Sequence, residues 1–79
     1  MDNKVEKRIK ESLSSVFKVP VDVIDENTSP HTLKGWDSLN HIKMILALED
    51  EFCIELDPTE IEAMISFDII RATISAYID

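Results

Sequence analysis

The chain has 79 residues, the length of one small domain with little interior for a deep catalytic pocket. Its 16 acidic and 8 basic residues give a net charge of −8, which disfavours nucleic acid and membrane binding, because both need basic patches. The hydrophobic fraction of 44% is too high for a disordered tail, and the presence of only one Gly and three Pro favours helices.

The first predicted element is an amphipathic helix that ends before Pro20. Its apolar residues lie three and four positions apart, as on one helix face: Val5, Ile9, Leu13, Val16 and Phe17. A turn-rich passage follows, from about Lys18 to Asp37. Its apolar residues are expected to anchor it to the core: Val21, Val23, Ile24 and Leu33. A loop of this length is uncommon in so small a domain and is usually functional.

The second helix is predicted to begin at Asp37 or Ser38, because both residue types are favoured as N-caps. Its buried side is expected to consist of residues at helical spacing: Leu39, Ile42, Ile45, Leu46 and Phe52. Cys53 is the only cysteine, so no internal disulfide can form. Its position between two apolar residues predicts a reduced, partly buried thiol in a cytosolic protein.

Two further helices are predicted, with Asp57 and Ser66 as their N-caps and Pro58 in the first turn of the shorter one. The expected inward residues are Ile61, Met64 and Ile65 in the third helix, and Phe67, Ile70, Ile74 and Tyr77 in the fourth. The short connections predict that successive helices pack as neighbours. The predicted fold is therefore all-α: a small four-helix bundle with a long loop between helices 1 and 2 and a short third helix.

Ser38 lies in the segment Gly35-Trp36-Asp37-Ser38-Leu39, where the loop meets the second helix. Its hydroxyl is expected to face solvent in the positive field of a helix N-terminus, where a phosphate group is favoured. Taken alone, a serine at a helix start is more often only an N-cap, but Asp37 is able to take over that role.

Neither the residues around Ser38 nor the acids that follow Leu48 have the arrangement of a catalytic site or a metal site. Asp37, Ser38 and His41 share one helical side, but the sequence offers no separate acid behind the histidine and no evident oxyanion donors. His41 is better explained as a surface histidine at a partner interface. The acids between Glu49 and Asp57 lack the alternating spacing and central glycine of a calcium loop. We therefore expect no catalytic residue and no metal site.

Over nearly its whole length the chain resembles an acyl carrier protein, as a single domain of residues 1–79. The resemblance rests on Gly-x-Asp-Ser-Leu, on Leu48-Glu49-Asp50-Glu51-Phe52 ten residues after the serine, and on the helix-length spacing on either side. In that family the serine, here Ser38, receives a 4′-phosphopantetheine arm from coenzyme A. The thiol at the end of the arm holds substrates as thioesters, and in some members a growing acyl chain folds back between the helices.

The resemblance implies a non-catalytic carrier, a cytoplasmic monomer on which partner enzymes act. Those partners would be a phosphopantetheinyl transferase (holo-ACP synthase), acyl-loading enzymes, and synthases or acyltransferases. The second helix would be the recognition face, with acids that attract basic partner residues. The expected partner-binding residues are Asp37, Leu39, Ile42, Leu46, Glu49, Asp50 and Met64.

Two departures from the family pattern bear on the pathway. Asn40 and Lys43 stand where many fatty-acid carriers have acids, and Trp36 stands where a smaller residue is usual. A specialised discrete carrier for polyketide, nonribosomal-peptide or lipid-modifying biosynthesis therefore fits at least as well as a carrier for fatty acid biosynthesis. The alternative function, which belongs to a different class, is that of an unmodified acidic helical adaptor that binds a basic protein.

Overall fold

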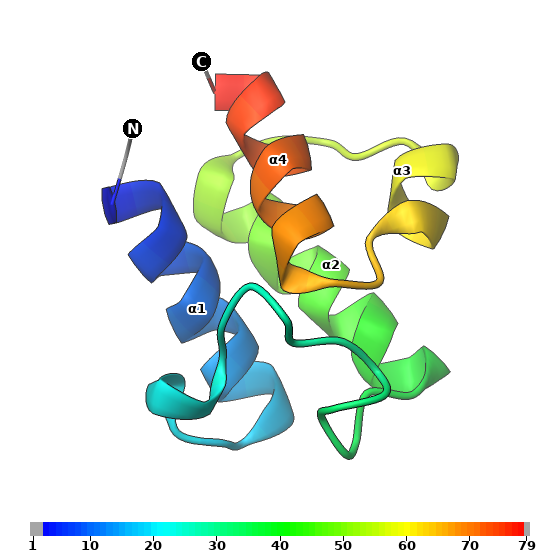
Figure 1. The fold of residues 1–79 in the computed structure, drawn as a ribbon. Coiled ribbons are helices and arrows are strands. Elements are labelled where there is room, and N and C mark those ends of the chain that lie inside the picture. The colour runs from blue at the N-terminus through cyan, green and yellow to red at the C-terminus, as the bar shows by residue number, and fades with distance from the viewer. Residues whose placement is uncertain (1–2, 79) are drawn as a thin grey trace.

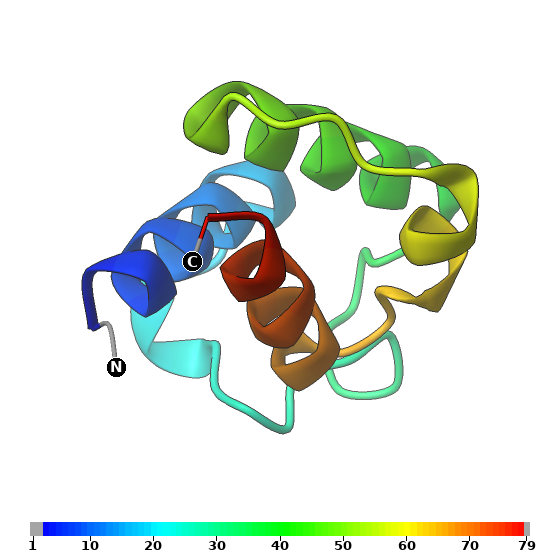
Figure 2. The ribbon, with the colours of Figure 1, turned by 90° about the horizontal axis from the view of Figure 1, so that it is seen from above.

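The computed structural model describes residues 3–78, and over these residues every regular element is helical (Figure 1). The elements are α1 (Asn3–Phe17), the short 3₁₀ helix η1 (Val21–Val23), α2 (Ser38–Phe52), α3 (Pro58–Ala63) and α4 (Phe67–Ile78). The predicted all-α fold, with its long loop between α1 and α2 and its short third helix, is confirmed. Figure 2 shows α2 running across α1 and α4, while α3 lies beside the N-terminal half of α2.

The core lies between α1, α2 and α4, which supply the side chains with no exposed surface. These are Ile9 and Leu13 from α1, Met44 and Leu48 from α2, Phe67, Ile70 and Ile74 from α4, together with Met64. In α1 and α4 the buried positions follow the three- and four-residue spacing that the sequence showed. Burial of this apolar surface is the main stabilising contribution to so small a domain.

The long loop is anchored to the bundle by Ile24 and Leu33, which are buried as expected. The expectation for Val21 and Val23 is wrong, because both lie in η1 with exposed side chains. The loop gains a polar anchor instead at Thr28, which is 2% exposed. Its hydroxyl accepts a hydrogen bond from the Asp25 N–H (2.8 Å), and its carbonyl accepts one from the Phe67 N–H (2.9 Å). The loop is therefore fastened to the start of α4.

The face that α2 turns inward differs from the predicted one. Ile45 and Phe52 are buried as expected, and Met44 and Leu48 complete that face. Leu39, Ile42 and Leu46 are instead 64%, 49% and 60% exposed. They form a second apolar stripe at helical spacing, beside the one that packs on α1 and α4. We call Leu39, Ile42 and Leu46 the exposed stripe of α2.

Residues within a few positions of the helix ends determine where α2, α3 and α4 begin or end. Asp57 and Glu60 form a reciprocal capping box around Pro58 at the start of α3, and the Ser66 hydroxyl accepts from the Ile69 N–H (3.2 Å) at the start of α4. Both predicted caps are confirmed. Cys53 closes α2 in the left-handed conformation with φ 54°, which turns its thiol outward, so the expectation of a partly buried cysteine is wrong.

In α3 and α4, Ile65 and Tyr77 also depart from prediction. Ile65 lies in the connection to α4 and is 53% exposed, while Ile61 is only half-buried and Met64 is buried as expected. Tyr77 is 39% exposed because its hydroxyl reaches out to donate a hydrogen bond to the Glu60 carboxylate. This contact joins the last turn of α4 to α3.

The Tyr77–Glu60 hydrogen bond predicts an unusual tyrosine titration. The contact with the Glu60 carboxylate, followed by desolvation, raises the pKa of Tyr77 from 10 to about 12. Since the folded-state pKa is the higher one, the stabilising effect of this contact is fully present below pH 10 and is lost as the pH rises through about 12. Tyr77 is the only tyrosine, so tyrosinate absorbance measures it directly, with circular dichroism at each pH as the check that the helices persist. The substitution Glu60→Gln should lower the midpoint, and a folded-state midpoint near 10 would contradict the contact.

Acidic residues dominate the segment that runs from α2 to the start of α4. Between Lys43 and Arg71 the chain has eight acids and no basic residue. The ion pairs found over residues 3–78 are Arg8–Glu51 (2.8 Å), Lys10–Glu6 (3.6 Å) and Arg71–Asp68 (2.6 Å), all on exposed or half-exposed side chains. Most of the acids therefore repel each other without a paired cation, and this repulsion is strongest when the Debye length is long.

Added salt or Mg²⁺ should therefore raise the melting temperature of the protein measured at low ionic strength, because screening weakens the repulsion. The variant Glu55→Gln removes one exposed charge from this acidic segment, so it should begin at a higher melting temperature and gain less from salt. Differential scanning calorimetry at increasing NaCl and MgCl₂ concentrations measures both effects. Identical melting temperatures at every concentration would show that the repulsion is negligible.

Candidate functional site

The turn that precedes α2 is fixed by its own backbone and by two side chains. Gly35 has φ 91°, a conformation that favours glycine, and its carbonyl accepts from the Asp37 N–H (2.9 Å). The Asn40 side-chain amide donates to the same carbonyl (2.7 Å). The Asp37 carboxylate accepts from the Asn40 N–H (2.8 Å), so Asp37 is the N-cap of α2. This arrangement fixes where α2 begins.

Ser38 is the first residue of α2, and its side chain is exposed. Because Asp37 supplies the cap, the start of the helix does not depend on the Ser38 hydroxyl. Within residues 3–78 no hydrogen bond to that hydroxyl is found, so it is available to a partner. Apart from the capping Asp37, the first turn of α2 contains no acid, so the partial positive charge of the helix N-terminus is offset by that one carboxylate alone. A phosphate group attached at Ser38 therefore suits this position.

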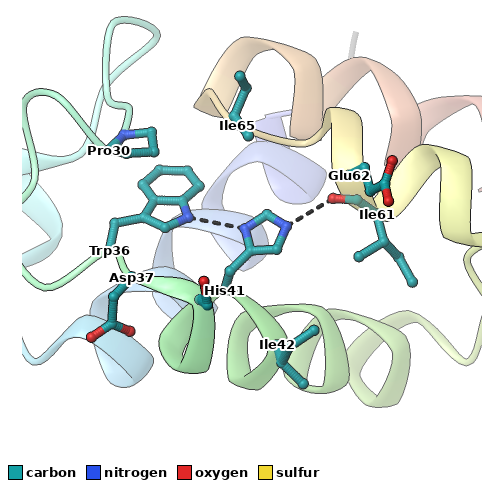
Figure 3. Close-up of a pocket in the computed structure, with 9 residues that line it drawn as sticks. Pro30, Trp36, Asp37, His41, Ile42, Ile61, Glu62 and Ile65 are labelled. Carbon is teal, nitrogen blue, oxygen red and sulfur yellow. Dashed lines mark hydrogen bonds between the residues drawn. The ribbon is translucent and has the colours of Figure 1, made fainter.

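Three residues are joined by a row of hydrogen bonds that starts at Trp36, the residue before the capping Asp37 (Figure 3). The indole N–H of Trp36 donates to Nδ1 of His41 (3.0 Å), and Nε2 of His41 lies 2.7 Å from the carbonyl oxygen of Ile61. A neutral imidazole with its proton on Nε2 makes both bonds at once. Trp36 is buried and its ring also packs against Phe17, with the ring centroids 5.2 Å apart. We call this set the Trp36–His41–Ile61 row.

The row corrects the expectation for His41. The imidazole is half-buried and both of its nitrogens are occupied within the protein, so it is not a free surface histidine. Neither nitrogen bonds to Ser38, so the row supplies no base to the Ser38 hydroxyl and Asp37, Ser38 and His41 do not form a catalytic triad. The sequence alone could not show this, because Ile61 is 20 residues further along the chain.

An open hollow of about 480 Å³ lies next to Ser38, between the loop, α2 and α3 (Figure 3). Its wall is mostly apolar, with carboxylates at two places: Pro30, Trp36, Asp37, Ser38, His41, Ile42, Ile61, Glu62 and Ile65 line it. The volume is in the range of sites that hold small organic molecules. The sequence did not indicate that the loop residue Pro30, the indole of Trp36 and the side chain of Ile65 would line one site.

The predicted partner-binding residues fall into three groups. Leu39, Ile42 and Leu46 make up the exposed stripe of α2, and Asp37 and Asp50 are exposed at its two ends. Glu49 is half-buried, and one of its carboxylate oxygens accepts from the Leu56 N–H (2.9 Å), so it holds the connection between α2 and α3. Met64 has no exposed surface, so its place among the surface contacts is wrong.

The described residues contain neither a metal-binding cluster nor a membrane-spanning helix. Over residues 3–78 there is no group of three or more His, Cys, Asp or Glu side chains placed to hold a metal ion. Within the same range no helix is both long enough and apolar enough to span a bilayer.

Comparison with known proteins identifies the family. Residues 7–66 match the family described as "Phosphopantetheine attachment site", and this stretch includes the loop, Ser38, α2 and α3. A similar relative is an acyl carrier protein of Buchnera aphidicola subsp. Schizaphis graminum (strain Sg), 36% identical over 62 residues, which is 78% of this chain and 78% of the relative. Both matches agree with the exposed serine at the capped start of α2. The chain belongs to the acyl carrier protein family, and its cofactor is a covalently attached 4′-phosphopantetheine.

Proposed function

We propose that Ser38 is the attachment residue for 4′-phosphopantetheine and that the chain carries acyl or related intermediates as thioesters. The observation that carries this proposal is that two residues have separate roles at the start of α2: Asp37 caps the helix, and Ser38 stays exposed. The thiol at the end of the bound arm supplies the thioester chemistry. The carrier serves fatty acid, polyketide or related biosynthesis in the cytoplasm.

The attachment reaction requires a partner enzyme. The Ser38 oxygen attacks the phosphorus of coenzyme A that bears the pantetheine, a phosphoester bond forms, and the bond to the adenosine bisphosphate leaving group breaks. The Ser38 proton goes to a base that the transferase supplies together with Mg²⁺. The residues of this chain contribute an accessible hydroxyl, a fixed helix start and the partial positive charge of the helix N-terminus near the phosphate.

The exposed stripe of α2 is the surface we propose for partner enzymes. Its three residues, Leu39, Ile42 and Leu46, follow directly from Ser38 along one side of the helix. Asp37 and Asp50 add acids at the two ends, where basic partner residues would bind, and Lys43 makes the middle less acidic. Loading enzymes, synthases and acyltransferases would share this surface, because the arm that they act on starts at its edge.

Intact-mass measurement tests the proposal. The purified protein is incubated with coenzyme A, Mg²⁺ and a broad-specificity phosphopantetheinyl transferase, and the expected result is a gain of one phosphopantetheinyl group. Peptide fragmentation should place the added group on Ser38. An unchanged mass with several transferases would overturn the proposal and would favour an unmodified adaptor that uses the same exposed stripe for binding. A modification on another serine would overturn the assignment of the site.

A further inference from the structure

Two side-chain hydrogen bonds tie the turn before Ser38 to the first residues of α2. The side-chain amide of Asn40 donates to the carbonyl oxygen of Gly35 (2.7 Å), and the indole N–H of Trp36 donates to Nδ1 of His41 (3.0 Å). Each bond joins residues that are five positions apart, and Ser38 lies within both spans. The backbone on either side of the Ser38 hydroxyl is therefore linked twice.

Asn40 takes part in this turn through both its backbone and its side chain. Its backbone N–H donates to the Asp37 carboxylate (2.8 Å), which caps α2. Its side-chain nitrogen donates to the Gly35 carbonyl, and the same oxygen accepts from the Asp37 N–H (2.9 Å). Both lone pairs of that oxygen are thus in use. One residue therefore holds the helix cap and also the turn that precedes it.

The bond to Gly35 requires a donor in the side chain of residue 40, because a carbonyl oxygen only accepts. Aspartate has nearly the same shape as asparagine, but its ionised carboxylate also only accepts and would repel the Gly35 carbonyl. Alanine would leave that carbonyl with the Asp37 N–H alone. Neither substitution changes the backbone N–H that donates to Asp37, so the side-chain bond can be removed while the cap remains.

The position of the Ser38 oxygen matters for the attachment reaction. In phosphoryl transfer the attacking and leaving oxygens are roughly in line, and a small displacement of a reacting atom lowers the rate. Gly35 is exposed, has φ 91° and has no side chain to anchor it, so this part of the turn depends on its hydrogen bonds. The bond from Asn40 is the side-chain contact that restricts it.

We propose that Asn40 is a positioning residue for the modification of Ser38, because its side-chain amide holds the turn of residues 35–37 and thereby presents the Ser38 hydroxyl to the transferase in one orientation. The proposal rests on the function proposed for Ser38. Asn40 does not contact the reacting atoms and acts through the Gly35 carbonyl. The bond between Trp36 and His41 supports the same turn from the side of the hollow.

Single-turnover kinetics test the role of Asn40. The protein is mixed with coenzyme A, Mg²⁺ and an excess of a broad-specificity phosphopantetheinyl transferase, and intact mass follows the modification. The maximum rate reports the chemical step, and the transferase concentration at half of that rate reports docking. In Asn40→Asp and Asn40→Ala the maximum rate should fall roughly ten-fold, with a smaller change in the half-saturating concentration. Asn40→Gln retains an amide donor and should recover most of the lost rate.

Asn27→Asp is the matched control for Asn40→Asp, because Asn27 is an exposed loop asparagine and the substitution adds the same negative charge. It should be modified at the rate of the unsubstituted protein. If position 40 acted only by its charge, an acid there would improve docking on a basic partner surface and would leave the maximum rate unchanged. The charge effect and the positioning effect therefore predict opposite results for Asn40→Asp.

NMR relaxation gives a measurement that needs no transferase. In the unsubstituted protein, the heteronuclear NOE of the backbone amides of residues 35–37 should be close to the values in α2. These values should be lower in Asn40→Asp and Asn40→Ala, because the turn then moves on the picosecond to nanosecond timescale. The values in the rest of α2 should persist, since the cap at Asp37 does not depend on the Asn40 side chain.

Each outcome bears on one of the two proposals. An unchanged maximum rate in both Asn40→Asp and Asn40→Ala would overturn the positioning role, as would a turn that stays equally rigid without the amide. Equal slowing in Asn27→Asp would also overturn it, because added charge would then explain the effect. Absence of any mass gain in the unsubstituted protein would refute the function proposed for Ser38 and the role of Asn40 with it, whereas normal loading of that protein separates the two.

Discussion

The substitution Ser38→Ala should abolish the mass gain on incubation with coenzyme A and a transferase, and it should leave the fold intact. The loss is complete because the reaction has no other oxygen to act on at this position. The fold survives because the Asp37 carboxylate, and not the Ser38 hydroxyl, accepts the N-cap hydrogen bond from Asn40. The free energy of unfolding should therefore change by no more than about 0.5 kcal/mol, as for an ordinary surface substitution. Intact mass and urea unfolding measure the two effects on the same sample.

Ser66→Ala is the matched control for Ser38→Ala, because Ser66 also stands at the start of a helix. Its hydroxyl is in use, since it accepts from the Ile69 N–H at 3.2 Å. The variant should lose about 1 kcal/mol of stability and should still gain one phosphopantetheinyl group. Comparison of the two variants therefore distinguishes the loss of a helix cap, which lowers stability, from the loss of the attachment site, which abolishes the mass gain. A Ser38→Ala protein that is modified normally, or that is much less stable than Ser66→Ala, would contradict the proposed role of Ser38.

The substitution Leu48→Ala should remove about 3 kcal/mol from the free energy of unfolding. Leu48 has no exposed surface, and truncation of a buried leucine removes apolar contacts and leaves a cavity in the core. For a chain of 79 residues the total free energy of unfolding is about 4–12 kcal/mol, so the loss is a large part of it. Urea titration followed by circular dichroism measures the change.

Leu46→Ala makes the same chemical change two residues earlier in α2, on a side chain that is 60% exposed. Its effect on stability should stay within about 0.5 kcal/mol. Its effect should show instead in slower modification by the transferase, because Leu46 belongs to the exposed stripe that we propose for partners. Equal losses of stability in the two variants would mean that the inward face of α2 is assigned wrongly.

The error in the inward face of α2 has a definite physical origin. The helix has two apolar stripes at helical spacing, one through Ile45 and Leu48 and one through Leu39, Ile42 and Leu46. Periodicity identifies such stripes but does not show which of them meets another helix. That choice depends on where α1 and α4 lie, which is a tertiary property. The second stripe is exposed, and this makes it available to partners.

Local features were predicted more accurately than distant contacts. The caps at Asp37, Asp57 and Ser66 depend on hydrogen bonds within a few residues, so the sequence is sufficient to predict them. The exposure of Ser38 follows from the cap that precedes it. The environment of His41 depends on a carbonyl 20 residues away, on an element whose position only the folded chain determines. The hollow could not be predicted for the same reason.

Trp36 gives this protein a property that is useful in the laboratory. It is the only tryptophan of the chain, its indole lies in the wall of the hollow, and its N–H is bonded to His41. The emission of an indole responds to the polarity of its surroundings, and a group that enters the hollow displaces water from the small part of this ring that is exposed there. Intrinsic fluorescence therefore offers a label-free optical signal of occupancy, with which the arrival and departure of a carried group can be followed in real time.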